Sequence, residues 1–243
     1  MYTRYFLPGQ KVLLKTFQPD TDSLRIESVN TRLVSYDDGR FELSLVHPWQ
    51  INEPFFASEN QEIEIISERF GIGLRSTGSF RGIAKGKLLR LQANYDLNLF
   101  RLKPKPRINT HIGFQQFSAK TGSSIFYRKW IQQIEKMKDL SAALSAPILP
   151  LGEVNISSTG LRAALKTPVA NHDLCLMMLE LHPDEKPICT LGEVVWSSPL
   201  TGTERYLAGL QFLNILKNDQ ERIEEFIKKD LAAATMKSTP ARA

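Results

Sequence analysis

The first hundred residues alternate apolar and polar positions in short runs, which is the period of a strand with one buried face. The pattern predicts seven strands, at 11–15, 24–29, 32–36, 41–46, 62–66, 74–81 and 87–92. Asp37-Asp38-Gly39 separates two of them and is a hairpin signal, because Asp and Gly tolerate positive φ. No helical stripe interrupts these runs, so this half predicts a small β-barrel or sandwich.

Helical spacing first appears at residues 123–145, where apolar residues recur every three or four positions. The stripe consists of Tyr127, Trp130, Ile131, Ile134, Met137 and Leu140. Such a face packs either on the domain core or on another subunit, and the spacing alone does not choose between the two.

A second helix is predicted to begin near Asn218, which has the spacing of a capping-box variant with Glu221. Its apolar face is expected to close one end of a second barrel and contains Ile223, Phe226, Ile227 and Leu231. The remaining strands of that barrel are predicted at 108–117, 148–156, 161–165, 174–181, 188–196 and 206–213.

The predicted fold class is therefore mainly β, with two small antiparallel β-barrels in tandem, the second carrying an inserted helix and a C-terminal helix. Pro104 and Pro106 break the strand pattern, which marks a linker. We expect an N-terminal barrel at 1–100, the linker at 101–108, a second domain at 109–234 and a flexible tail at 235–243.

The charge is unevenly placed along a chain of 243 residues whose 42% hydrophobic content is enough to bury a core. Between Arg101 and Lys138 there are nine Lys and Arg residues and one acidic residue, Glu135, which gives this segment a net charge of +8. Since the whole chain has a net charge of +5, the rest of the chain has a net charge of −3. Such a local basic zone favours contact with a phosphate or polyanion, with a solvated helix face plus linker as the alternative.

Several classes of protein find no support in the sequence. There is no apolar run long enough for a membrane span and no signal peptide, so a cytoplasmic location is the default expectation. Cys175 and Cys189 lack disulfide or zinc spacing and are expected to be buried thiols. No metal site is predicted, because the histidines occur singly, at His47, His111, His172 and His182.

Two segments carry the candidate chemistry, Lys103-Pro-Lys-Pro-Arg107 and Asn155-Ile-Ser-Ser-Thr-Gly160. The first presents cations on a stiffened segment. In the second, Asn155 and Ser157 offer short hydrogen-bonding side chains, and Gly160 permits a turn through positive φ or a close approach to a ligand. Together they predict an anion-binding pair of loops rather than a catalytic centre.

The order of these parts resembles the PilZ family, in its two-domain flagellar-brake type with an N-terminal β-barrel. Asn155, Ser157 and Gly160 match the family's [D/N]xSxxG motif. The family's RxxxR motif corresponds to Lys103 to Arg107, with lysine in the first position. Residues 188–212 and 219–227 are similar to the family's closing hairpin and C-terminal helix.

The resemblance implies a noncatalytic receptor for cyclic di-GMP, which would be its ligand and not a cofactor. Arg107 and Lys103 would contact phosphate and guanine, although lysine lacks the planar fork of a guanidinium. Asn155 and Ser157 would hydrogen-bond the ligand, and Gly160 would allow its close approach. The auxiliary residues would be Arg101 and Lys105.

Binding at the interdomain hinge would reorient the barrels and regulate a protein partner in motility or envelope-polysaccharide machinery. A homo-oligomer formed through the inserted helix is a further expectation, whereas nucleic acid and a membrane span are not expected. The alternative is a degenerate PilZ protein that binds no nucleotide and acts as an interaction or oligomerisation module, which Lys103 favours. An enzyme ranks third, because Gly71-Ile-Gly73 is followed by no GKS or GKT phosphate loop.

Overall fold

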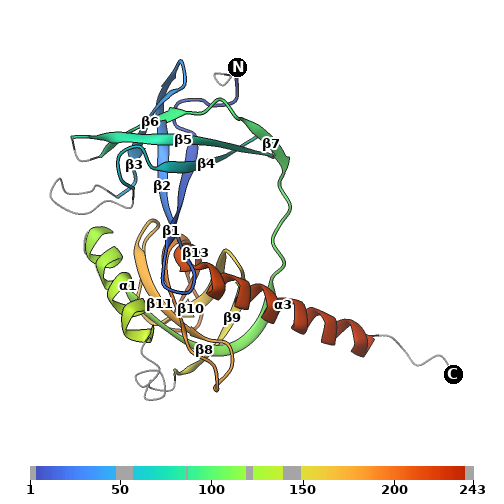
Figure 1. The fold of residues 1–243 in the computed structure, drawn as a ribbon. Helices are drawn as coiled ribbons and strands as arrows, with labels where there is room; N and C mark the ends of the chain where they lie inside the picture. Colours follow the sequence, from blue (N-terminus) through green and yellow to red (C-terminus); the bar gives the residue numbers. More distant parts are fainter. Residues whose placement is uncertain (1–3, 48–56, 86, 119–122, 139–148, 239–243) are drawn as a thin grey trace. The chain divides into compact units, whose positions relative to one another are not determined.

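The computed structural model describes residues 4–47, 57–85, 87–118, 123–138 and 149–238. The chain separates into two compact units, the first formed mainly by Arg25–Pro104 with the preceding strand, and the second by Lys105–Lys120 and Phe126–Ala243. Figure 1 shows the strands and helices of each unit along the chain.

The first unit is an antiparallel β structure. Its ring follows the order β1-β4-β5-β6-β3-β2 and closes because β2 also pairs with β1, while β7 pairs with the first residues of β5. The strands are β1 (Lys11–Pro19), β2 (Leu24–Asp37), β3 (Arg40–Leu45), β4 (Glu62–Arg69), β5 (Ile72–Ala84), β6 (Leu88–Ala93) and β7 (Asn98–Arg101).

The long strand β2 replaces the two strands predicted at 24–29 and 32–36. Asn30 and Thr31, which lie between the two predicted strands, are buried and remain within β2. The hydroxyl of Thr31 donates a 2.8 Å hydrogen bond to the backbone carbonyl of Val12, so its burial leaves no unpaired donor. The predicted hairpin after β2 is confirmed, with positive φ at Asp38 and Gly39.

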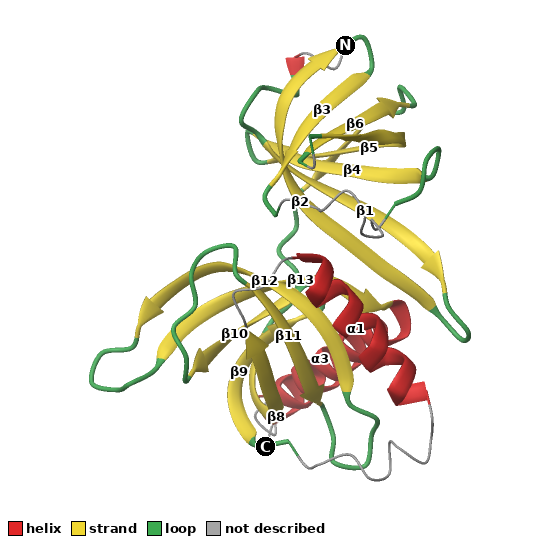
Figure 2. Cartoon of the chain, turned by 90° about the vertical axis from the view of Figure 1, so that its left-hand side faces the viewer, coloured by secondary structure: helices red, strands yellow, loops and turns green. Residues whose placement is uncertain are grey.

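The second unit closes in the same way. Every pairing in the ring β8-β9-β10-β13-β12-β11 is antiparallel, and β11 returns to β8. Figure 2 shows the strands of this unit curving around one another, with helices beside them. The strands are β8 (Ile108–Ser118), β9 (Leu151–Ser157), β10 (Gly160–Leu165), β11 (Leu174–Glu180), β12 (Ile188–Pro199) and β13 (Tyr206–Leu216).

The inserted helix α1 (Ser123–Lys138) uses its apolar stripe for the core of this unit. Phe126, Trp130 and Ile134 are buried at four-residue spacing, and the indole Nε1 of Trp130 donates a 3.2 Å bond to the carbonyl of Cys189 in β12. Of the two expected uses of the predicted face, the core is therefore the one observed for Trp130 and Ile134, whereas Phe126 was not part of the predicted stripe. Residues 139–145 of the predicted helix, including Leu140, lie outside the described residues.

The C-terminal helix α3 (Lys217–Ser238) lies against β13, β8 and β9 through Ile223 and Ile227, which are buried. The predicted apolar face ends there, because Leu231 is 41% exposed. The helix also continues to Ser238, so the first residues assigned to the flexible tail are helical.

The predicted fold class is confirmed: the described chain is mainly β, with two antiparallel rings in tandem, an inserted helix and a C-terminal helix. Both Cys175 and Cys189 are buried, as predicted, and burial raises the pKa of each thiol, that of Cys175 to about 12. None of the helices in the described part of the chain is long and apolar enough to span a bilayer.

Trp130→Ala should lower the free energy of unfolding by about 3–5 kcal/mol, because it empties a fully buried site. Trp130→Phe should cost about 1–3 kcal/mol through the lost hydrogen bond and part of the volume. Urea unfolding measures both, with Gln132→Ala on the exposed side of the same helix as the control. A Trp130→Ala protein as stable as this control would show that α1 does not pack on the core.

Candidate functional site

The predicted motif lies where β9 turns into β10, on the outer surface of the second ring. Antiparallel pairing places Asn155 of β9 opposite Arg162 of β10, while the flanking Val154, Ile156 and Leu161 are buried. The same row continues across neighbouring strands, so that five positions line up side by side: Asn109, Asn155, Arg162, Gly209 and Trp196.

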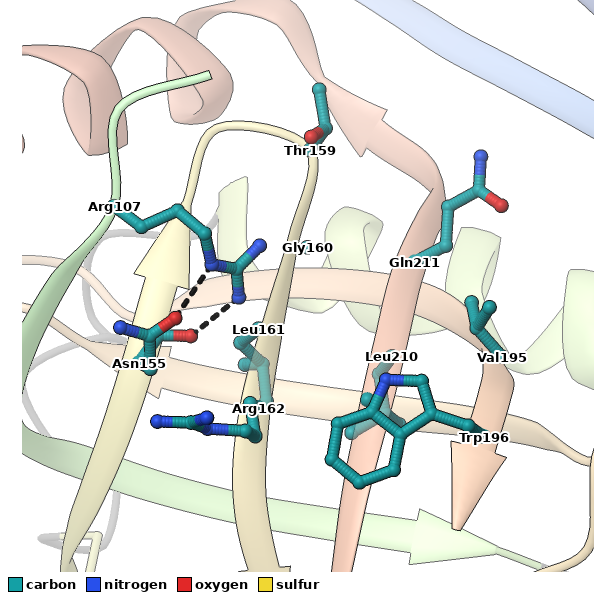
Figure 3. Close-up of a pocket in the computed structure, with 11 residues that line it drawn as sticks. Arg107, Asn155, Thr159, Gly160, Leu161, Arg162, Val195, Trp196, Leu210 and Gln211 are labelled. Carbon is teal, nitrogen blue, oxygen red and sulfur yellow. Dashed lines mark hydrogen bonds between the residues drawn. The ribbon is translucent and has the colours of Figure 1, made fainter. Parts of the chain in front are cut away.

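The guanidinium of Arg107, one residue before β8, is bound to the motif by three hydrogen bonds. Its Nε donates to Oδ1 of Asn155 at 2.6 Å, its Nη2 donates to the backbone carbonyl of Asn155 at 2.7 Å, and its Nη1 donates to Oγ of Ser157 at 3.0 Å. Figure 3 shows the two bonds to Asn155. The two predicted segments therefore meet, and Asn155 and Ser157 hold Arg107 in place.

Both acceptors are themselves oriented by neighbours. The amide nitrogen of Asn155 donates to Oδ1 of Asn109 at 2.8 Å, which leaves the Asn155 amide oxygen for Arg107. The buried hydroxyl of Ser157 donates to the carbonyl of Gly160 at 3.1 Å and so accepts from Arg107. Because both acceptors are fixed by their own neighbours, the three hydrogen bonds hold the guanidinium in one orientation.

Gly160 has a role in strand pairing that was not predicted. Its φ is not positive, and a Cβ at this position would lie 2.2 Å from the backbone carbonyl oxygen of Leu210 in β13. The close approach is therefore to the neighbouring strand, whose register pairs Gly160 with Gln211. Gly160 allows β10 to pair closely with β13, which in turn fixes the start of the β10 strand.

A pocket of about 540 Å³ lies over this row of residues, within the size range of small-molecule sites. It is lined by Arg107, Asn155, Thr159, Gly160, Leu161, Arg162, Val195, Trp196, Gly209, Leu210 and Gln211. These described lining residues include two guanidinium groups and no carboxylate. The pKa of Arg107 is lowered, first by burial and second by the nearby charge of Arg162. The site therefore carries unneutralised positive charge, which favours an anion.

An aromatic surface lies at the other side of the pocket. The register of β12 and β13 shifts between Val194 and Trp196, and the Trp196 indole covers Gly209, where a Cβ would lie 2.3 Å from Nε1. Trp196 is 40% exposed, and Figure 3 shows its ring beside the strand that carries Leu210. A flat exposed indole next to two guanidiniums suits a ligand that combines aromatic rings with negative charge.

The other predicted binding residues lie outside this cluster. Lys105 pairs with Glu224 of α3 at 3.5 Å between Nζ and Oε1. Lys103 and Arg101 belong to the first unit, where both are exposed. Arg107, Asn155, Ser157 and Gly160 are thus the predicted residues that the second unit brings together.

Arg162 and Trp196 were not among the predicted site residues. Arg162 is two positions after Gly160, so the alternation of a strand starting at Gly160 could have placed it on the outer face with Asn155. Trp196 could not be found in this way, because the bulge before it changes which face its side chain meets. Among the described residues, no group of three His, Cys, Asp or Glu side chains gathers as a metal site would require.

Comparison with known families gives a match to the PilZ domain over residues 144–229. This segment contains the Asn155 to Gly160 turn, strands β9 to β13 and the first part of α3. The chain carries a PilZ domain. The resemblance to the PilZ family drawn from the sequence is confirmed for this segment, and PilZ domains form a family of cyclic di-GMP effectors. No curated protein matches the chain at the level of sequence.

Solved structures of low identity also match along most of the chain. The Bacillus subtilis inhibitor of motility (MotI/DgrA) is 13% identical, covers 94% of this chain and 99% of its own, and has a TM-score of 0.37. Escherichia coli YcgR in complex with cyclic di-GMP is 12% identical, with 96% and 89% coverage and a TM-score of 0.37. K. pneumonia MrkH is 16% identical, with 95% and 89% coverage and a TM-score of 0.41. At these values the likeness supports no conclusion about ligand or role.

Gly160→Ala should lower the free energy of unfolding by about 1–3 kcal/mol, because the new methyl group would overlap the Leu210 carbonyl. Gly152→Ala is the matched control in β9, since its Cβ would meet Phe114 at an ordinary 3.6 Å. Urea unfolding of both variants tests the assignment. Equal stability of the two proteins would mean that Gly160 is not needed for strand pairing.

Proposed function

We propose that this protein is a noncatalytic cytoplasmic receptor that binds cyclic di-GMP in the pocket of its PilZ domain. One observation carries the proposal: Arg107 and Arg162 line the same pocket with no described carboxylate between them, beside the exposed indole of Trp196. A cyclic dinucleotide offers what this arrangement lacks, namely phosphate charge together with flat bases.

Arg107 is the principal binding residue in this proposal. Three of its five N–H groups bond Asn155 and Ser157, which leaves two for a phosphate or a guanine edge. Asn155 and Ser157 then act mainly by positioning Arg107, so little side-chain entropy is lost when the ligand binds. Gly160 acts more indirectly, through the pairing of β10 with β13.

Arg162 and Trp196 complete the proposed site. Arg162 supplies a second guanidinium across the strand from Asn155, close enough to lower the pKa of Arg107, so a phosphate would relieve the repulsion between the two cations. Trp196 supplies a stacking surface for a base, a contact that contributes about 1–3 kcal/mol per base in single-stranded nucleic-acid complexes.

The linker residues would add to this site when the ligand binds. Lys103 supplies charge without the planar fork of an arginine, and Arg101 is auxiliary. Lys105 would have to leave Glu224, an exposed pair whose loss costs little. We propose that residues 101–108 form the linker between a domain at 1–100 and a domain at 109–234. Ligand binding would rearrange the two domains, and this rearrangement would act on a protein partner in motility or envelope-polysaccharide machinery.

A second candidate is a PilZ domain that no longer binds nucleotide and acts as an interaction or oligomerisation module. Two observations favour it: lysine stands at position 103, and the Arg107 guanidinium already has three protein acceptors. In that case the Arg107 contacts serve stability alone.

Calorimetric titration with cyclic di-GMP should show binding, accompanied by a change in tryptophan fluorescence that is absent in Trp196→Phe. Arg162→Ala should weaken binding by at least about tenfold, the loss expected for one charge-assisted contact. Lys166→Ala is the control, because it removes an exposed charge just after the same strand. No heat at high ligand concentration, or equal affinities for the two variants, would contradict the proposed site.

Lys103→Arg separates the two candidate functions. A receptor whose linker has been weakened should gain affinity for cyclic di-GMP, because a guanidinium can form a bidentate contact that an ammonium cannot. Calorimetry measures the gain, with Lys87→Arg, at an exposed position in the first unit, as the control. If the wild-type chain does not bind cyclic di-GMP and Lys103→Arg does not bind it either, the result would support the interaction module.

A further inference from the structure

The turn between β4 and β5 has an unusual sequence. Phe70 and Gly71 are its two central residues, with φ of 54° and 72°, the conformation of a type I′ hairpin turn. Asn, Asp or Gly normally occupy both positions, because other side chains are strained at positive φ. The β2–β3 turn of the same unit follows this rule with Asp38-Gly39. Phenylalanine therefore occupies position 70 at a cost to folding.

The strain at Phe70 is not offset by burial of its side chain. The Phe70 side chain is 85% exposed, the highest value among the large exposed hydrophobic residues of the described chain. A residue that is both strained and exposed is unfavourable for stability on two counts, which points to a use of the side chain outside folding.

Further apolar side chains gather at the same end of the first unit. Strand β7 runs antiparallel to β5 with Arg101 opposite Ile72, so the residue after Arg101 lies toward the turn. Figure 1 shows β7 beside β5. Four apolar residues here are between 37% and 44% exposed: Ile72, Leu99, Phe100 and Leu102. We call Arg69–Ile72 together with Leu99–Lys103 the hairpin-tip surface.

The charges of the hairpin-tip surface are all positive. The guanidinium carbon of Arg69 lies 4.6 Å from the centroid of the Phe70 ring, and Arg69 also donates to the backbone carbonyl of Arg4. Pairing of β4, β5 and β7 places Ile72 between Arg69 and Arg101. With Lys103 the surface carries three cations, and it is bordered by one exposed acid, Glu68, which strand pairing places in the row of Gly73 and Phe100.

We propose that the hairpin-tip surface docks on an anionic lipid bilayer. Phe70 and its apolar neighbours would enter the boundary between headgroups and acyl chains, while Arg69, Arg101 and Lys103 remain at the level of the lipid phosphates. The complementarity of charge and the exposed tip carry the assignment. An aromatic anchor for a protein partner typically sits within a packed, shielded contact, whereas Phe70 stands at the end of a turn.

Arg69, Phe70 and Ile72 lie in the first unit and have no part in the proposed nucleotide site, whereas Arg101 and Lys103 are also its proposed linker contacts. Binding to vesicles can therefore fail while cyclic di-GMP still binds, and the reverse. The surface would hold the chain at a membrane face without any spanning segment.

Vesicle co-sedimentation of the full chain tests the proposal. Wild type should bind vesicles of phosphatidylcholine and phosphatidylglycerol in equal amounts, and should not bind phosphatidylcholine alone. Phe70→Asn should weaken binding at least about tenfold, because an inserted aromatic ring is lost. The same variant should keep or raise the melting temperature, because Asn-Gly is preferred in this turn. Phe17→Thr removes another exposed phenylalanine that lies under a lysine, and should bind like wild type.

Arg69→Gln with Arg101→Gln should abolish the preference for phosphatidylglycerol, and added salt should weaken wild-type binding. Three results would overturn the proposal: no binding of wild type to either vesicle, equal binding to both, or binding by Phe70→Asn as strong as wild type. A peptide of alternating Glu and Leu is the competing probe. Tight binding of this peptide without vesicle binding would assign the surface to an acidic protein segment instead.

Discussion

The candidate site of the second unit is organised by one bridge, the guanidinium of Arg107 held by the end of strand β9. Its three hydrogen bonds join the segment before β8 to the turn between β9 and β10, about fifty residues later in the chain. Asn109 and Gly160 support the same bridge by fixing the Asn155 amide and the Ser157 hydroxyl. Because every acceptor is neutral, the positive charge of Arg107 is oriented without being neutralised, which is the condition for an anion site.

The fold could be predicted from the alternation of apolar and polar residues and from the turn-forming residues between strands, because both are local properties of the sequence. β2 was predicted as two strands that leave out Asn30 and Thr31, and only the long-range contact of Thr31 with Val12 explains the burial of this polar residue within one strand. The predicted apolar face of α3 extended too far, because it included Leu231, which is exposed. Nothing in the sequence marks where the strand ring beneath the helix ends.

The candidate site was predictable to the extent that its motif is contiguous. The pattern from Asn155 to Gly160 located the turn, and the basic segment located Arg107. What the residues do depends on register: Arg162 and Trp196 reach the pocket through pairings between β9, β10, β13 and β12. Gly160 was predicted to allow ligand approach, and strand register adds that its missing side chain makes room for the Leu210 carbonyl. Cross-strand register and bulges depend on the folded structure. A contiguous motif can therefore locate a site, but the role of each residue in it follows only from the strand pairing.

The bonds that hold Arg107 do not count against its use in binding. Asn155 and Ser157 offer neutral oxygens, and a phosphate would offer charged ones, which form hydrogen bonds roughly twice as strong. A phosphate can therefore use the two remaining N–H groups without displacing the existing partners, and the charge of Arg162 adds to the attraction. Arg107 and Phe70 share one property, which is that each is held at a local cost. Arg107 is a part-buried cation near the charge of Arg162, and Phe70 is an exposed aromatic residue at positive φ. Such local costs in an otherwise consistent fold are where functional contacts are expected.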